Sequence, residues 1–175
     1  MSTYVAMLRA VNVGGSLMPM ADLRAAFVDM GHDDARTYIQ TGNVVLASST
    51  PTARLQAEIE TGLETRFGRA VPVVLRTGTQ LARVVRANPL AGERDPKKTH
   101  VTFLRQKPEA ARVRGLDNEA FLPDEFRVAG LEVYVYCPNG YGRTKITNAY
   151  FERALKVPAT TRNLNTVTKL VGMAT

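Results

Sequence analysis

Residues 35–47, ARTYIQTGNVVLA, contain two strand-like runs on either side of the pair Gly42-Asn43. The pair resembles the Asn-Gly turn of a tight hairpin in reversed order, because glycine and asparagine both tolerate positive φ angles. The stretch therefore predicts two strands, 35–41 and 44–47, joined by a short turn. On this interpretation Asn43 adopts the left-handed conformation that such a turn requires.

The elements on both sides of this hairpin alternate between strand and helix. A strand is predicted at residues 3–9, and residues 19–30 carry apolar side chains at the spacing of a helix. After the hairpin, residues 52–67 are predicted as a second amphipathic helix, and 71–75 as a strand that Pro72 favours at a sheet edge. The order β-α-β-β-α-β is that of a ferredoxin-like unit, in which two helices cover one face of an antiparallel sheet.

The rest of the chain repeats most of this order. Residues 80–87 are predicted as a connecting helix, and the polar segment 89–98, PLAGERDPKK, as the division between two halves. A strand, a helix, a hairpin and a helix are then predicted at 101–104, 108–115, 125–136 and 148–155. The sequence thus predicts an α+β protein of two ferredoxin-like subdomains packed into one compact protein. Their expected bounds are 1–88 and 89–175, the second with a C-terminal helical extension.

Composition excludes several classes of protein. The chain has 175 residues and 45% apolar content, enough for a core, but no run approaches the roughly 18 to 20 apolar residues of a membrane span. Its N-terminus does not have the pattern of a signal peptide, so a cytoplasmic location and no membrane partner are expected. One cysteine, Cys137, and two histidines allow neither an internal disulfide nor a zinc motif, so neither a metal nor a cofactor is expected.

Positive charge increases along the chain. The first 78 residues have a net charge of zero (7 − 7), residues 79–140 have +2 (10 − 8), and residues 141–175 have +5 (6 − 1). A basic surface of this kind suits an anionic partner, either nucleic acid or a phosphorylated small molecule.

Two glycine-containing loops are candidates for contact with that anion. The loop at 12–16, NVGGS, lies between a strand and a helix, where backbone N–H groups can hold a phosphate, although a simple turn also explains its glycines. Its spacing matches neither GxGxxG nor GxxxxGK[ST]. The loop at 140–145, GYGRTK, places Arg143 and Lys145 ahead of a helix and favours anion binding more strongly.

The run 160–165, TTRNLN, is expected to begin the last helix. An N-cap role explains Thr161 or Asn163. It does not explain Arg162, a cation near a helix N-terminus, which the helix dipole disfavours by roughly 0.3–1 kcal/mol. A bound anion would offset that cost.

Four separated segments carry a resemblance to a known family. They are YVAMLRAVNVGG with MADLR, TYIQTGNVV, YGRTKITNAYFE and VPATTRNLNTVTKL. Together they resemble the uncharacterised bacterial family called domain of unknown function 1697. The resemblance implies an α+β fold of two ferredoxin-like subdomains and no established activity. The motif positions to which it points are Arg9, Asn12, Gly14, Gly15, Gln40, Gly42, Asn43, Arg143, Lys145, Asn148, Thr161, Arg162, Asn163 and Asn165.

Two functional hypotheses follow. The first is a nonenzymatic anion-binding protein, with nucleic acid among its candidate partners, that uses the basic C-terminal surface. The alternative is an enzyme acting on a small phosphorylated or carboxylated substrate held between the two halves. All the motif positions except Gly42 and Thr161 are ligand-binding candidates. The Gly14-Gly15 loop, the Arg143/Lys145 loop and the Arg162/Asn163 helix start are expected to lie together on one surface. A flat basic sheet would favour the first hypothesis and a closed pocket the second, while no GxSxG, HExxH or triad spacing identifies a catalyst.

Overall fold

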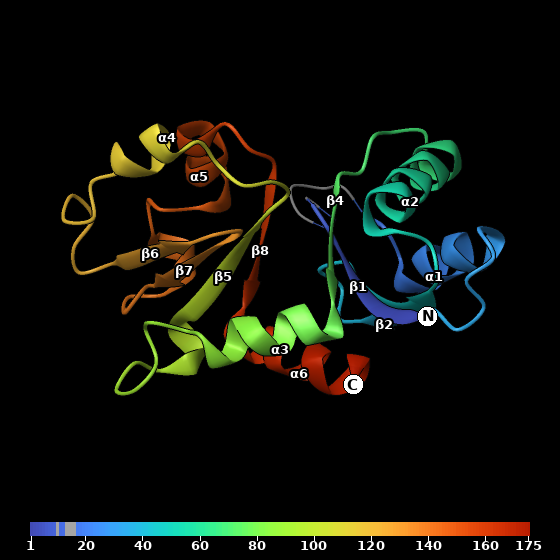
Figure 1. Cartoon of the computed structure of the whole chain (residues 1–175), viewed down its shortest axis with the longest axis horizontal. Helices are drawn as coiled ribbons and strands as arrows, with labels where there is room; N and C mark the ends of the chain where they lie inside the picture. Colours follow the sequence, from blue (N-terminus) through green and yellow to red (C-terminus); the bar gives the residue numbers. More distant parts are fainter. Residues whose placement is uncertain (10, 13–16) are drawn as a thin grey trace. The chain divides into compact units, whose positions relative to one another are not determined.

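Two four-stranded antiparallel sheets and their helices make up the structure, a computed structural model that describes residues 1–9, 11, 12 and 17–175 (Figure 1). By its internal contacts the chain divides into two units. The first unit is Met1–Leu81 with Leu170–Thr175, and the second unit is Ala82–Lys169.

The sheet of the first unit has the strand order β2-β3-β1-β4. Side chains alternate along β1, so that Tyr4, Ala6 and Leu8 enter a core shared with two helices on one face of the sheet. Gly68 ends the longer helix in the left-handed conformation, with φ of 70°. The elements are β1 (Ser2–Leu8), α1 (Met20–Asp29), β2 (Arg36–Tyr38), β3 (Asn43–Ser48), α2 (Thr52–Phe67) and β4 (Val73–Thr77).

The sheet of the second unit has the equivalent order, β6-β7-β5-β8. One face of this sheet packs against two helices through Leu104, Val133 and Phe151. Its elements are β5 (Thr99–Leu104), α4 (Ala110–Arg114), β6 (Glu125–Ala129), β7 (Glu132–Tyr136), α5 (Asn148–Leu155) and β8 (Ala159–Asn163). Because both units share the β-α-β-β-α-β order and the same strand arrangement, the predicted α+β fold of two ferredoxin-like halves is confirmed.

The division between the units differs from the sequence expectation. It falls at residues 81–82, inside α3 (Gly78–Arg86), and not in the polar segment 89–98. The end of α6 (Leu164–Ala174) belongs to the first unit, where Arg36 Nη2 donates a hydrogen bond to the Met173 carbonyl oxygen at 2.7 Å. At Gly78 a Cβ atom would lie 2.6 Å from the Ala174 carbonyl oxygen, so the approach of these two helix ends requires glycine.

Two local predictions are wrong. Residues 159–163 do not begin the last helix but form β8, which pairs antiparallel with β5. In the β2–β3 hairpin Asn43 is the first residue of β3, and the positive φ angles belong to Ile39 (48°) and Gly42 (84°). The turn is therefore longer than Gly42-Asn43.

Two short 3-10 helices, η1 (Pro96–Lys98) and η2 (Tyr141–Arg143), complete the described elements. None of the helices in the described part of the chain combines the length and the apolar character needed to cross a membrane.

Candidate functional site

The amide of Asn12 connects its loop to the β2–β3 turn. Asn12 Nδ2 donates to the carbonyl oxygens of Met18 (3.0 Å) and Gln40 (2.6 Å), and Oδ1 accepts from the Met18 N–H. The residue itself has a φ of 58°, a conformation that asparagine tolerates better than most residues. Asn12 therefore has a structural role, whatever else it contacts.

Asn43 is fully buried at the other end of the same turn. Its Nδ2 donates to the Tyr38 carbonyl oxygen (3.1 Å) and to Thr41 Oγ1 (2.9 Å). These bonds hold the turn closed, and the burial removes Asn43 from the surface on which a ligand was expected.

Asn148, the first residue of α5, lies at the centre of a hydrogen-bond network. Its Nδ2 donates to the Ala159 carbonyl oxygen (2.9 Å) and to Glu152 Oε1 (3.2 Å). Its Oδ1 accepts from Thr161 Oγ1 (2.9 Å), and its backbone N–H donates to Tyr141 Oη (2.9 Å). The network joins α5, β8 and η2, so two of the motif segments, YGRTKITNAYFE and VPATTRNLNTVTKL, meet here through contacts within the protein.

Asn163 and Asn165 lie at the start of α6. Asn163 Nδ2 donates to the Lys97 carbonyl oxygen (2.9 Å), and its Oδ1 accepts from the Asn165 N–H (2.9 Å). Asn163 thus satisfies a free N–H at the helix start, which is the capping role considered from the sequence.

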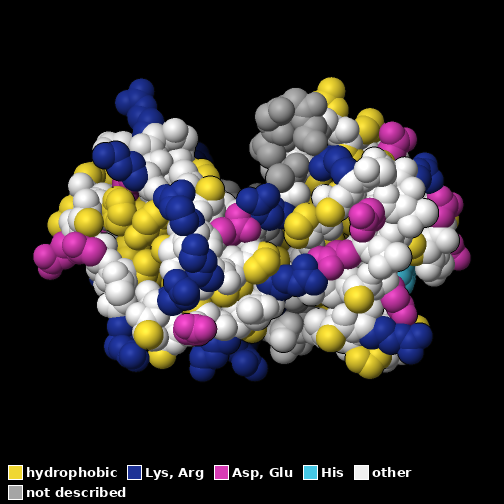
Figure 2. All heavy atoms as spheres, turned by 90° about the horizontal axis from the view of Figure 1, so that it is seen from above, with side chains coloured by type: hydrophobic (Ala, Val, Ile, Leu, Met, Phe, Trp, Pro, Cys, Tyr) yellow, Lys and Arg dark blue, Asp and Glu magenta, His cyan; other side chains and the backbone are white. Residues whose placement is uncertain are grey.

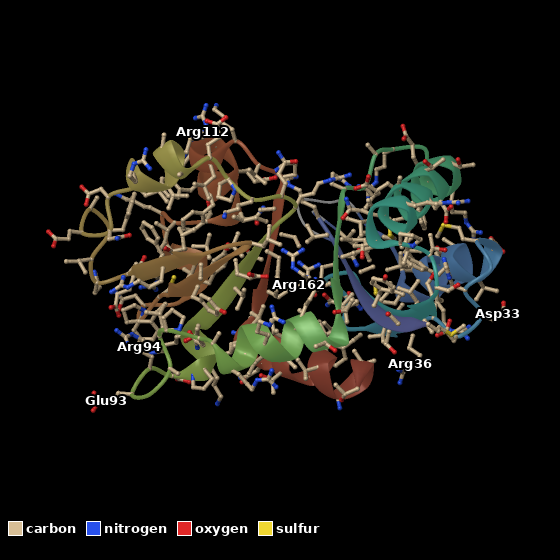
Figure 3. All side chains as sticks on the ribbon, in the orientation of Figure 1. Asp33, Arg36, Glu93, Arg94, Arg112 and Arg162 are labelled. Atoms are coloured by element: carbon tan, nitrogen blue, oxygen red, sulfur yellow. The ribbon has the colours of Figure 1, made fainter. Side chains whose placement is uncertain are left out.

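Arg162 lies one residue before Asn163, the cap of α6, and so precedes the helix instead of belonging to its first turn. It lies in β8 and is only 7% exposed, whereas the side chain of Arg112 on α4 points outward (Figure 3). Its Nη1 donates to Thr160 Oγ1 (2.7 Å) and to the Thr161 carbonyl oxygen (3.0 Å). Burial lowers the pKa of Arg162 to about 10. The argument that a bound anion offsets a helix dipole at Arg162 no longer applies.

Substitutions at Arg162 should separate packing from charge. Arg162→Ala leaves a cavity, and we expect it to lower the free energy of unfolding by about 2–4 kcal/mol. Arg162→Met fills much of the same volume without a buried charge, and we expect a change within about 1 kcal/mol. Urea unfolding of both variants measures the difference. Equal stability of the alanine variant and the wild type would contradict the buried position.

Arg143 and Lys145, by contrast, are exposed and line one pocket of about 320 Å³ in the second unit. The loop that carries them is anchored from inside, since Thr144 Oγ1 donates to Asp124 Oδ2 at 2.6 Å. Gly140, with φ of 93°, allows the sharp turn at its start. The other residues around the pocket come from the loop before β6 and from the end of the β7–η2 connection: Ala120, Phe121, Leu122, Pro123, Asp124, Asn139 and Gly140.

Two stacked rings support the loop that carries Arg143 and Lys145. His100 on β5 stacks on Tyr141, with ring centroids 4.4 Å apart and an interplanar angle of 24°. The His100 Nδ1 atom is buried without a hydrogen-bond partner among the described residues, and burial lowers the pKa of His100 to about 4. Burial also raises the pKa of the neighbouring Cys137 thiol. Both groups are therefore neutral at physiological pH.

The remaining candidates are less informative. Arg9 is half-buried and donates its backbone N–H to the Pro72 carbonyl oxygen (2.9 Å), and Gln40 is exposed. Gly14 and Gly15 lie outside the described residues, so the expected meeting of their loop with the other two stays a prediction. Within residues 1–9, 11, 12 and 17–175 no cluster of His, Cys, Asp and Glu could hold a metal ion.

Sequence reasoning found the two basic residues of the pocket but missed its other wall. Phe121 and Asp124 come from an irregular segment about twenty residues earlier in the chain. Nothing local in the sequence indicates that this segment packs beside Arg143, because the contact is tertiary.

Comparisons with known proteins bear on the family and the fold of the chain. The model of the family described as "Protein of unknown function (DUF1697)" matches residues 1–134. The chain belongs to this family. Among solved structures, the conserved bacterial protein SP0830 from Streptococcus pneumoniae is similar, with a TM-score of 0.76 and 23% identity over 99% of this chain and 98% of that one. At this identity the similarity shows the fold alone. No curated protein matches the chain.

Proposed function

We propose that the protein binds a small ligand bearing a phosphate or carboxylate group in the pocket at Arg143 and Lys145. The observation that carries the proposal is that two exposed cations from one anchored loop line the same hollow. A guanidinium can hold two oxygens of such a group at once, and an ammonium adds a point charge. The volume of about 320 Å³ lies at the lower end of the range for small-molecule sites.

The charge of the second unit supports an anionic ligand. Residues 82–169 contain 16 Lys and Arg against 9 Asp and Glu, a net charge of +7, while the first unit has 7 of each. Figure 2 shows Lys and Arg side chains gathered over the second unit, at the left of the view. Such a field raises the local concentration of anions and speeds their association.

The burial of the sheet favours a small ligand over a nucleic acid strand stacked on it. In the described part of the second unit, both sheet faces carry buried side chains, with Phe103 and Tyr134 on one face and Leu104 and Val135 on the other. Tyr134 Oη donates to the Val84 carbonyl oxygen at 2.8 Å, so this aromatic ring is engaged in packing. Nucleic acid would have to bind outside the sheet. We therefore propose a binding function and assign no catalytic residue.

The test compares two double variants with equal loss of charge. Isothermal titration with inorganic phosphate and with pyrophosphate should show affinity lower by about tenfold or more in Arg143→Ala/Lys145→Ala, as expected for lost charge-assisted hydrogen bonds. The matched control, Arg83→Ala/Arg86→Ala, removes two exposed cations from α3 in the same unit and should bind nearly as the wild type does. Equal weakening in both variants would mean that net charge, and not the pocket, holds the anion.

The salt dependence of binding distinguishes the nucleic-acid hypothesis from binding of a small anion in the pocket. If about four phosphates of an oligonucleotide are neutralised, log K should fall with log salt at a slope of roughly −3 to −4. A ligand in the pocket, held by two groups, should show a shallower dependence. Fluorescence anisotropy of labelled RNA and DNA measures the first case. A steep slope, unchanged by the Arg143 and Lys145 substitutions, would replace the proposed function with nucleic-acid binding elsewhere.

A further inference from the structure

A second hollow, of about 310 Å³, lies between α4 and the tip of the β6–β7 hairpin. Its walls are apolar: Pro108, Ala110, Val113 and Val128 line it, together with Gly130 of the hairpin turn. It shares no lining residue with the pocket at Arg143 and Lys145. It is therefore a separate site, and nothing in the proposed function uses it.

The helix that borders the hollow, α4, is short. The helix has five residues, Ala110–Arg114, while α5 in the same layer buries Phe151 and Leu155. Val113 and Val128 contact the edge of the core but stay half-buried. An apolar hollow open at the surface is typical of a binding site.

The strand beside the hollow is at the edge of its sheet. In the order β6-β7-β5-β8, β6 has one neighbour among the described strands. An edge strand presents backbone N–H and C=O groups to which an extended peptide can add. Alternate side chains of an added strand would point to the helix-covered face, where Val128 borders the hollow.

The charges around the hollow indicate the charge of the partner that it would bind. Lys107 and Arg114 line it. Two acids on the neighbouring elements are matched with basic groups, since Glu109 Oε2 lies 3.8 Å from Arg112 Nε and Glu125 accepts two hydrogen bonds from Arg94 at 2.8 and 2.9 Å. Figure 2 shows basic side chains beside hydrophobic ones over this unit. The surroundings complement an acidic segment.

We propose that the hollow and the β6 edge form a docking site for an extended acidic segment of another protein. One apolar side chain of that segment enters the hollow, acidic side chains on either side meet Lys107 and Arg114, and its backbone pairs with β6.

The experiment selects from a displayed library of heptapeptides with an apolar central residue and either acidic or basic flanks, using the full chain as target. Acidic peptides should be enriched over basic ones by about tenfold or more, the change expected when one or two charge pairs form at a partly desolvated surface. The charge reversal Lys107→Glu/Arg114→Glu should invert the preference. The matched reversal Arg83→Glu/Arg86→Glu on α3 should leave it unchanged. The selected peptide made with N-methyl groups on alternate amides should bind about tenfold more weakly if its backbone pairs with β6.

Four outcomes would overturn the proposal. They are the absence of any enriched peptide, enrichment independent of flank charge, equal effects of the two charge reversals, and insensitivity to N-methylation. Sedimentation of the chain alone tests whether a second copy of the chain occupies the site instead. Self-association that Lys107→Glu/Arg114→Glu abolishes would assign the site to that second copy.

Discussion

Replacing Asn148 by alanine should lower the free energy of unfolding by about 2–4 kcal/mol, because several buried or half-buried partners lose a hydrogen bond at once. The side chain holds the Ala159 carbonyl oxygen, Thr161 Oγ1 and Glu152 Oε1. Asn148→Asp keeps the shape but replaces the Nδ2 donor by a second acceptor opposite Glu152, so it should be at least as unstable. Urea unfolding followed by circular dichroism measures both variants.

The control for this prediction is Asn118→Ala, in an exposed loop of the same unit, which should change stability by no more than about 0.5 kcal/mol. A result in which Asn148→Ala keeps full stability but loses phosphate binding would contradict the structural role. It would return Asn148 to the ligand-binding set that the sequence suggested.

The pH dependence of stability should carry a contribution from His100. Its pKa is about 4 in the folded protein and near its ordinary value of 6.5 in the unfolded chain. Below pH 6.5 the unfolded chain gains a proton that the folded protein does not take until about pH 4, so acidification favours unfolding. The contribution is fully present above pH 6.5 and is lost as the pH falls to about 4, by on the order of 3 kcal/mol in total.

Unfolding free energies at several pH values between about 4.5 and 7.5 test this expectation. His100→Asn removes the titrating group, so the difference between wild type and variant isolates it from the carboxylates that titrate in the same range. His32→Asn, which removes the other histidine, is the matched control, and its slope is compared with that of the wild type. If His100→Asn also kept that slope, His100 would not be the group that resists protonation.

The sequence could predict the fold because its elements are locally encoded. Leu55, Ile59 and Leu63 recur at helical spacing in α2, and Gly68 ends that helix as predicted. The strand β8 was missed because Ala159–Asn163 has one apolar residue, and its strand conformation depends on pairing with β5, about sixty residues earlier. Two consecutive β-branched residues, Thr160 and Thr161, were the available signal.

The candidate site could be predicted in part. Charge is additive along the sequence, so the basic character of the second half and of the loop with Arg143 and Lys145 could be predicted directly. The direction in which a side chain points could not be predicted from the sequence. An asparagine that holds the backbone, as Asn12, Asn43 and Asn148 do, has the same sequence signature as one that holds a ligand. Only the tertiary partners distinguish the two cases.

The end of α6 gives the protein an order of assembly during synthesis. The hydrogen bond between Arg36 and Met173 spans 137 positions in the sequence, and the first unit includes Leu170–Thr175. On the ribosome the strands of the first sheet leave the exit tunnel long before the helix segment that packs at Gly78. The N-terminal half therefore lacks the contacts of this segment until the second unit has been translated. Contacts of such long range are slow to form, so this last segment is expected to join the first unit late in folding.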